Sequence, residues 1–303
     1  MATFFLLIVG GLVHGTGASL ACPDWPTCHG TLMPEMTGLV FYEHGHRLVA
    51  SAVGLMTLVL AGLIWTGFRE NPALRWLGVT AAVLVILQGL LGAATVIWRL
   101  PPAVSTAHLG TAMVYFGLLV VIAFLTRPGR PVAGVPEGEL HPFPAIRRWT
   151  AVSTAVVYVQ IVLGAVVRHT NAGLACTGFP LCGETAWPAG AVWVHMGHRI
   201  GALLVIAAVV MLVLVIRREA PLHRAFRTLR VALLVMLAVQ AGLGIASVFT
   251  RLELVTVTAH LAGGAALLAL HVAAWMVSRE ANRFGTPLAA ETVTGGARPS
   301  EAI

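Results

Sequence analysis

The residues best suited to catalysis or metal binding lie in Phe41–Arg47. Here a glutamate, two histidines and an arginine directly precede a long apolar run. A related group, His195-Met-Gly-His-Arg199, precedes a second apolar run. Ionisable side chains at the end of a membrane-type segment are energetically costly, so their presence indicates a functional site. The recurrence of the His-Arg pair predicts that the chain contains two copies of one structural unit.

The repeat extends through both halves of the sequence. Gly10–Cys22 matches Gly164–Cys176, and the later positions match after a two-residue shortening of the second copy. The matched residues include uncommon types and not only Leu and Ala, so chance is a poor explanation. They are Pro26 with Pro180, Cys28 with Cys182, His46-Arg47 with His198-Arg199, Gln88 with Gln240, and His108 with His260.

The composition is typical of an integral membrane protein. Of the 303 residues, 58% are hydrophobic and 10% are charged, whereas soluble domains contain about 25% charged residues. The mean hydropathy is +0.87. A helix crosses a bilayer with about 20 apolar residues, and the sequence contains eight runs of about this length. They are Ala2–Leu20, His46–Gly67, Leu74–Ile97, Ala103–Leu125, Trp149–Val167, Val194–Ile216, Leu229–Phe249 and Leu254–Val277.

The first run, Ala2–Leu20, is the weakest of the eight. It lacks a basic N-terminal region and contains His14 and several glycines. A signal peptide is the alternative interpretation. Because its end matches the end of Trp149–Val167 in the second copy, we interpret it as a membrane span.

The charge pattern predicts how the chain crosses the membrane. The net charge is +7, and all 19 basic residues are arginines. They lie mainly in short segments between apolar runs, which favours a topological signal over nucleic-acid binding. When the N-terminus is placed in the cytoplasm, most of the arginines are cytoplasmic too. We therefore expect a multi-pass protein of the cell (plasma) membrane with both termini cytoplasmic and all cysteines in outer loops.

These features predict an all-α fold of eight transmembrane helices. Each copy contains four spans, an even number, so the two copies have the same orientation. We expect two pseudo-symmetric four-helix bundles related by an axis along the membrane normal. The predicted domains are an N-terminal bundle at 1–127 and a C-terminal bundle at 149–282, joined by a cytoplasmic Pro/Gly-rich linker at 128–148. A polar tail at 283–303 is expected to be disordered.

Two histidines per copy are placed to bind a planar metal group. His46 and His108 begin the second and fourth spans at similar depth, and these helices are diagonal in an up-down bundle. His198 and His260 repeat the arrangement. Two facing imidazoles are typical axial ligands of haem iron, so each half is predicted to hold one haem. Zinc is less suitable because it needs three or four close ligands.

Other interpretations of these histidines remain open. Each could be a packing residue or part of a proton relay. Three further histidines near the span ends are competing ligands, although the repeat argues against them: His44, His169 and His195. His271 lies on the same helical face as His260 but has no partner in the first copy, which favours a buried hydrogen-bonding role.

One difference between the copies indicates chemistry in the first half. Glu43 lies three residues before His46, whereas the matched position is His195. A carboxylate beside a haem edge can act as a general base or stabilise a developing cation. The alternative is a solvated interfacial acid paired with Arg47. Arg47 and Arg199 are candidates for binding haem propionates, although snorkelling of either side chain is an equally good account.

The four cysteines form two pairs with the same spacing. Cys22 and Cys28 lie in one predicted outer loop, and Cys176 and Cys182 lie in the other. An oxidising outer compartment makes an intraloop disulfide plausible in each. The second pair is interpreted as a structural staple. For the first pair, near Glu43, redox exchange with the site is nearly as well supported.

Over nearly its whole length the sequence resembles the haem A synthase family of cytochrome oxidase assembly. The resemblance rests on Gly10–Val13, the loop Cys22–Cys28, the Glu-x-x-His-Arg pattern at Glu43–Arg47, and single histidines at 108, 198 and 260. It implies that the N-terminal half binds the substrate haem O, with His46 and His108 as axial ligands and Glu43 as the essential carboxylate. The C-terminal half would hold a haem b cofactor through His198 and His260.

The resemblance also implies the reaction and the partners. A ring methyl group of haem O would be oxidised to the formyl group of haem A by successive hydroxylations. A haem O synthase and an electron acceptor are the expected partners besides the lipid bilayer, nucleic acid is not expected, and a homo-oligomer is possible. The chain departs from the family at His14, where the second copy has Arg168 and a basic residue is common.

Two other functions remain open from the sequence. A non-enzymatic dihaem electron carrier, for example one linked to quinol, would need the four histidines but not Glu43. A haem-handling chaperone or transporter would release haem without altering the ring.

Overall fold

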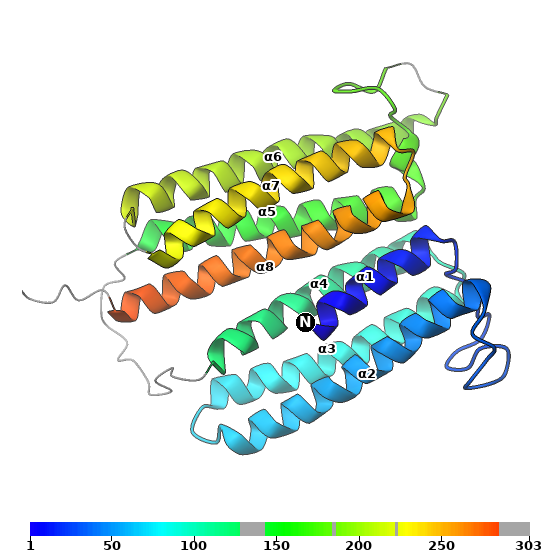
Figure 1. Cartoon of the computed structure of the whole chain (residues 1–303), viewed down its shortest axis with the longest axis horizontal. Helices are drawn as coiled ribbons and strands as arrows, with labels where there is room; N and C mark the ends of the chain where they lie inside the picture. The colour runs from blue at the N-terminus through cyan, green and yellow to red at the C-terminus, as the bar shows by residue number, and fades with distance from the viewer. Residues whose placement is uncertain (128–142, 184–185, 222–223, 285–303) are drawn as a thin grey trace, which may run out of the picture.

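The computed structural model describes residues 1–127, 143–183, 186–221 and 224–284 (Figure 1). All regular elements of this part of the chain are helical, apart from one isolated bridge between Cys28 and Thr31. They are α1 (Ala2–Gly15), α2 (Gly38–Gly67), α3 (Pro72–Ile97), α4 (Pro102–Leu125), α5 (Pro144–His169), the 3-10 helix η1 (Ala172–Leu174), α6 (Ala189–Glu219), α7 (Arg224–Phe249) and α8 (Leu254–Phe284). The expected all-α fold is confirmed.

The helices form two groups of four, α1–α4 and α5–α8, which lie side by side (Figure 1). The groups meet through α1 and α4 on one side and α5 and α8 on the other. Glycines permit close approach at both contacts, as is common between membrane helices. An added Cβ at Gly11 of α1 would lie 3.0 Å from Leu261 of α8, and one at Gly110 of α4 would lie 3.4 Å from the Tyr158 hydroxyl of α5.

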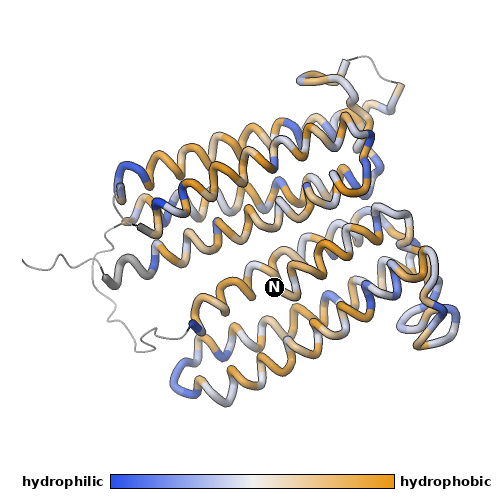
Figure 2. Tube along the Cα trace, viewed as in Figure 1, coloured by the Kyte–Doolittle hydropathy of each residue, from blue (hydrophilic) through white to orange (hydrophobic). Residues whose placement is uncertain are grey.

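The helices of both groups are mostly hydrophobic along their length, and hydrophilic residues gather toward their ends (Figure 2). Seven of the described helices are long and apolar enough to cross a membrane. Large aliphatic side chains point outward from them, including Leu55 (65% exposed) and Leu203 (65% exposed). Exposed leucines over whole helices are costly in water but favourable in lipid. The chain is therefore a multi-pass membrane protein.

Helix α1 is shorter than the predicted span Ala2–Leu20, so the predicted end of this span was wrong. The helix has 14 residues, which corresponds to about 21 Å at the usual rise. It ends in a Schellman motif: Gly17 adopts φ +73°, and the amide of Ala18 donates to the Val13 carbonyl (2.9 Å). Glycine takes this left-handed position without steric cost, so Gly17 stops the helix before the apolar run ends.

Other helices begin earlier than predicted. Helix α2 starts at Gly38 and α6 at Ala189, so the chemically interesting residues lie inside helices rather than at their mouths. Helix α5 starts at Pro144, because proline is well suited to the first helical position. The rest of the predicted linker and nearly all of the predicted tail lie outside the described residues, so the domain division stays a prediction.

The repeat is visible in the backbone as well as in the sequence. The turn between α3 and α4 has Arg99 and Leu100 at φ +56° and +62°, and the turn between α7 and α8 has Arg251 and Leu252 at +53° and +65°. Each turn is closed by a 2.7 Å bond from the amide of its leucine. Non-glycine residues rarely adopt this conformation, so its recurrence at matched positions supports the duplication.

The two cores differ in polarity. In the first half, the buried hydroxyl groups of Tyr115 (α4) and Thr57 (α2) are hydrogen-bonded to each other, and Thr57 also donates to the Val53 carbonyl (2.8 Å). The matched residues of the second half are Leu267 and Val209, both fully apolar and buried. The first half therefore contains a polar tie between α2 and α4 at a place where the second half has two apolar side chains.

Candidate functional site

The two repeat-matched histidines of the second half face each other inside the bundle. His198 lies on α6 and His260 on α8, which are diagonal rather than neighbouring helices. Their ring centroids are 6.4 Å apart and their planes are nearly perpendicular, at 89°. Two metal–nitrogen bonds of about 2 Å plus the half-widths of the two rings account for a separation of this size. The pair therefore fits an iron between two axial imidazoles.

The matched histidines of the first half occupy equivalent places. His46 lies on α2 and His108 on α4, again diagonal helices, and the two rings are close enough to interact electrostatically. The structure thus places all four histidines inside the two helix groups at positions related by the repeat, as the sequence analysis expected. Their assignment as haem ligands stays a prediction.

Each of these histidines rests against a glycine of the preceding helix. An added Cβ would lie 3.1 Å from His46 Cε1 at Gly10, 3.5 Å from His108 Cε1 at Gly92, 3.0 Å from His198 Cε1 at Gly164, and 3.0 Å from His260 Cε1 at Gly244. Three of these distances are tighter than ordinary van der Waals contact. The missing side chain therefore lets the ring lie flush with the neighbouring helix, and the glycine fixes where the imidazole edge sits.

Glu43 is buried at the loop-facing end of α2, with 4% of its surface exposed. Its Oε2 accepts a bond from the Cys22 amide (2.7 Å), and its Oε1 pairs with Arg47 Nη2 (2.6 Å). The carboxylate is therefore not the solvated interfacial acid of the alternative interpretation, although it does pair with Arg47. A buried carboxylate needs such partners, because an unpaired buried charge is very costly.

Arg47 and Arg199 bind the two cysteine loops. Arg47 Nη1 donates to the carbonyls of Asp24 (2.7 Å) and Thr27 (2.6 Å), and Nη2 also donates to that of Cys22 (3.1 Å). Arg199 donates in the same way to three carbonyls of the second loop, at distances of 2.6–3.1 Å: Cys176, Gly178 and Pro180. Sequence reasoning missed this role, because backbone acceptors leave no pattern in a sequence. The propionate assignment of both arginines stays a prediction.

Both loops contain the expected intraloop disulfides, Cys22–Cys28 and Cys176–Cys182. The first loop is organised by Asp24, which accepts bonds from the Thr27 hydroxyl and from the amides of His29 (2.6 Å) and Gly30 (2.9 Å). These bonds, that of Thr27 first, lower the pKa of Asp24 to about 2. The second loop has Gly178 at the matched position, where a side chain would collide with the Leu181 and Cys182 carbonyls.

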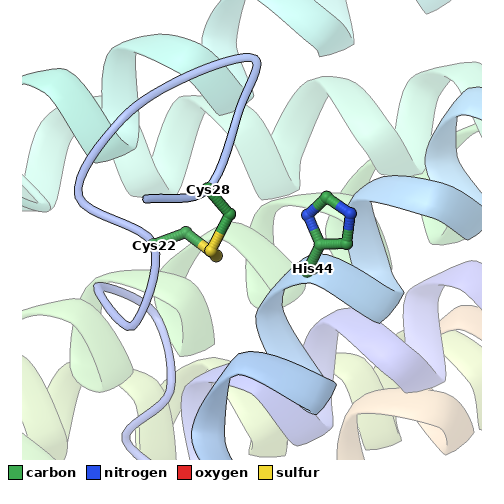
Figure 3. A group of neighbouring side chains, drawn as sticks. All are labelled: Cys22, Cys28 and His44. Carbon is green, nitrogen blue, oxygen red and sulfur yellow. A yellow bond between two sulfur atoms is a disulfide. The ribbon is translucent and has the colours of Figure 1, made fainter. Parts of the chain in front are cut away.

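His44 lies directly beside the first disulfide (Figure 3). One of its ring nitrogens and the two sulfur atoms fall within 4.8 Å of one another. The group is not a metal site as it stands, because both sulfurs are joined to each other and offer no thiolate. His44 Nε2 instead donates to the Leu32 carbonyl (3.1 Å), so the histidine helps to hold the loop.

The competing histidines all have other partners. His195 Nδ1 bonds to the Ala172 carbonyl of η1 (3.0 Å), and His169 Nδ1 bonds to the Thr106 hydroxyl (3.2 Å). His271 is fully buried, with Nδ1 on the Leu267 carbonyl and Nε2 on the Ser153 hydroxyl, each at 2.8 Å. This is the buried hydrogen-bonding role that the sequence indicated for His271.

A polar junction between the halves was not identified from the sequence. His14 of α1 and His169 of α5 make an edge-to-face contact with ring centroids 5.3 Å apart. Arg168, which stands where the first copy has His14, donates to the Gly11 carbonyl of α1 (3.1 Å). Adjacent His and Arg residues at the end of a span were the available signal, but their partners lie in the other half of the chain.

Fold and site together define an integral membrane protein with a pair of diagonal histidines inside each four-helix half. The chain belongs to the family of cytochrome oxidase assembly proteins, whose family model matches residues 35–272. It is 32% identical over 267 residues to a haem A synthase of Bacillus licheniformis, covering 86% of this chain and 87% of that protein. It is 33% identical over 268 residues to a haem A synthase of Geobacillus kaustophilus, covering 86% and 83%. A third haem A synthase, from Shouchella clausii, is 34% identical over 260 residues.

Proposed function

We propose that this chain oxidises a methyl group of haem O to the formyl group of haem A during the biogenesis of cytochrome oxidase. The chain is an oxidoreductase of the haem A synthase type. In the proposal the first half binds haem O through His46 and His108. The single observation that supports assigning the substrate to the first half is the buried carboxylate of Glu43. The matched residue of the second half is His195, which has no carboxylate.

The residues of the second half fit a resident haem b. His198 and His260 present facing imidazoles at a suitable separation. When bound, haem b supplies one-electron redox chemistry. The chain's own contribution is to hold the ligands on diagonal helices and to exclude water from them.

Glu43 is positioned to influence the first half through its fixed charge. Its two oxygens are anchored by Cys22 and Arg47, and a carboxylate retains further acceptor capacity beyond two such bonds. In the proposal Glu43 accepts a proton, or stabilises positive charge, as the methyl carbon is oxidised. With water as the oxygen source, two successive hydroxylations consume two water molecules and release four protons and four electrons, the electrons passing to an electron acceptor. Loss of one water from the geminal diol then leaves the formyl group.

The proposed topology places this site near the outer membrane surface. Both disulfide loops lie at the same end of the helix groups (Figure 1). Disulfides persist in oxidising compartments, and the arginine distribution favours the opposite end as cytoplasmic. The haem sites, which lie near the loops, would then face the outer leaflet of the cell membrane, with haem O delivered by a haem O synthase.

The test is to express the chain together with a haem O synthase and to identify the extracted haems by chromatography and mass. The proposal predicts a haem carrying a formyl group. A folded, haem-loaded protein that accumulates haem O without any formyl product would contradict it and would favour the dihaem electron carrier. Release of unaltered haem alone would instead favour a haem-handling protein.

A further inference from the structure

Three of the four matched histidines have a glutamine amide beside them. Gln160 Nε2 donates to the His198 carbonyl (2.8 Å) and lies 3.0 Å from its Nδ1, and Gln240 Nε2 donates to the His260 carbonyl (3.0 Å). With its amide oriented so that both ends find partners, Gln88 makes the same contacts with the His108 carbonyl (3.1 Å) and Nδ1 (3.2 Å). Each glutamine is one helical turn before the glycine that supports the same histidine.

The fourth position breaks this pattern. One turn before Gly10, which supports His46, the residue is Leu6. Leucine has no group that can bond to an imidazole or to a carbonyl. Correspondingly, Nδ1 of His46 is buried without a hydrogen-bond partner. His260 Nδ1 also lacks a partner, but its helix keeps the amide bond to the backbone carbonyl, so His46 alone has neither contact from a glutamine.

A second residue near His46 also differs from its counterpart in the second half. Gly201 and Gly263 make room for the amides of Gln160 and Gln240, because a Cβ at either glycine would overlap the amide oxygen. The first-half counterpart of Gly201 is Val49. Leu6 and Val49 both pack against the apolar core of α2, α3 and α4. An amide with a glycine in the second half is thus replaced by two aliphatic side chains in the first.

A hydrogen-bonded neighbour matters for a metal-bound histidine. It fixes the orientation of the ring, selects the tautomer and raises the basicity of the nitrogen that binds the metal. In the orientation observed, the amide donates to the histidine carbonyl; if rotated, its oxygen would accept from a protonated Nδ1 and give up the bond to that carbonyl. The Oε1 atoms of Gln160 and Gln240 are buried without partners, so each is available as an acceptor. His46 has no such support.

We infer that His46 is the weakly held axial ligand, and that Leu6 and Val49 make the first half the exchangeable haem site. The inference rests on the proposed function. A substrate haem must enter and its product must leave, whereas a resident haem must stay. The glutamines contact the rings of His108 and His198 and the backbone of His260. His46 has neither contact and provides the bond that breaks readily when haem is taken up or released.

The test uses the whole purified protein from cells that make haem O, with apomyoglobin as a haem acceptor. Haem transferred to apomyoglobin is identified by mass, so haem O or haem A reports the first half and haem b reports the second. The wild-type protein is expected to lose its first-half haem at least about 10-fold faster than it loses haem b from the second half. The reason is that removing such a neighbour changes metal affinity by about 10- to 100-fold.

Two reciprocal double variants provide the matched comparison. Leu6→Gln with Val49→Gly supplies the missing amide and should slow the loss of the first-half haem about 10-fold. Gln160→Leu with Gly201→Val removes the amide and should accelerate the loss of haem b by a similar factor. Val49→Gly alone is the control, because it makes space without an amide and should not slow release.

The outcomes separate the inference from the proposed function. Unchanged transfer rates in both double variants, with both haems bound and their absorption spectra intact, would overturn the inference and leave the proposed function standing. Should cells that make haem O form no haem A when they express the wild-type chain, the proposed function itself would fail. If one double variant does not fold, the other still decides, because each predicts a shift in the opposite direction for a different haem.

Discussion

Arg47 Nη2 lies 2.6 Å from Glu43 Oε1, and the same guanidinium group binds three carbonyls of the loop whose Cys22 amide also holds the carboxylate. The acid, the arginine and the disulfide loop therefore form one connected unit at the end of α2. In the second half Arg199 binds its loop alone. The carboxylate is the addition that distinguishes the first half.

Removing the arginine should affect the two halves unequally. Arg47→Met leaves Glu43 buried without its cationic partner, which costs about 3 to 5 kcal/mol in such pairs. Arg199→Met removes hydrogen bonds but strands no charge, so a smaller loss is expected. Thermal unfolding in detergent compares the two variants. Equal destabilisation would show that the ion pair adds nothing beyond the bonds to the loop.

The glycines beside the histidines should differ in their tolerance of a methyl group. Gly164→Ala places a Cβ 3.0 Å from His198 Cε1, and Gly10→Ala places one 3.1 Å from His46 Cε1, whereas Gly92→Ala leaves 3.5 Å to His108. The first two variants should shift their imidazoles and lose or alter one haem, and Gly92→Ala should be mild. Haem content per protein and the low-spin absorption bands measure this. A uniform response to all three substitutions would contradict the role given to the close contacts.

The first loop should loosen in acid. The hydrogen bonds to Asp24 lower its pKa to about 2, below the usual value of about 3.9. The stabilisation is therefore fully present above about pH 4 and is lost as the pH falls toward 2. The rate at which a phosphine reductant cleaves Cys22–Cys28 should therefore rise as the pH falls across this range. Labelling of the released thiols measures this rate. In Asp24→Asn the extra acid sensitivity should be absent, and the loop Cys176–Cys182, which has Gly178 at this place, is the internal reference.

The polar tie of the first half should contribute modestly to stability. Tyr115→Phe removes the bond to Thr57 but leaves the bond from Thr57 to the Val53 carbonyl. Hydrogen bonds between membrane helices contribute about 0.6 kcal/mol on average, so a loss of that order is expected in detergent unfolding. A loss of several kcal/mol would indicate that the hydroxyl supports more than this one helix contact.

The features that the sequence predicted share a physical basis in local patterns. Apolar runs with capping prolines specify the helices, and the duplication relates His46 to His198 without any structure. The histidine and cysteine pairs followed because these residues are rare and their spacing is repeated. The disulfides needed only a shared loop.

The features that the sequence did not predict depend on the path of the backbone. Arg47 binds backbone carbonyl groups. Every residue has one, so the residue types in the loop do not reveal which carbonyls the arginine binds. The end of α1 was missed because Gly17 lies within an apolar run, and only its positive φ identifies it as a helix stop. The glutamine at 160 has no counterpart in the first copy, so the repeat comparison alone gave it no weight.

The most direct test of the central assignment is the haem composition of Glu43→Gln beside the wild-type chain, each expressed with a haem O synthase. The amide keeps the size of the side chain and one of its two acceptor oxygens, but it removes the charge and places an NH2 group where the other oxygen accepts a bond from Cys22 or Arg47. We predict haem A and haem b from the wild-type chain, and haem O and haem b from Glu43→Gln, with both haems still bound. Formation of haem A at an undiminished level by Glu43→Gln would contradict the role of this carboxylate in the reaction.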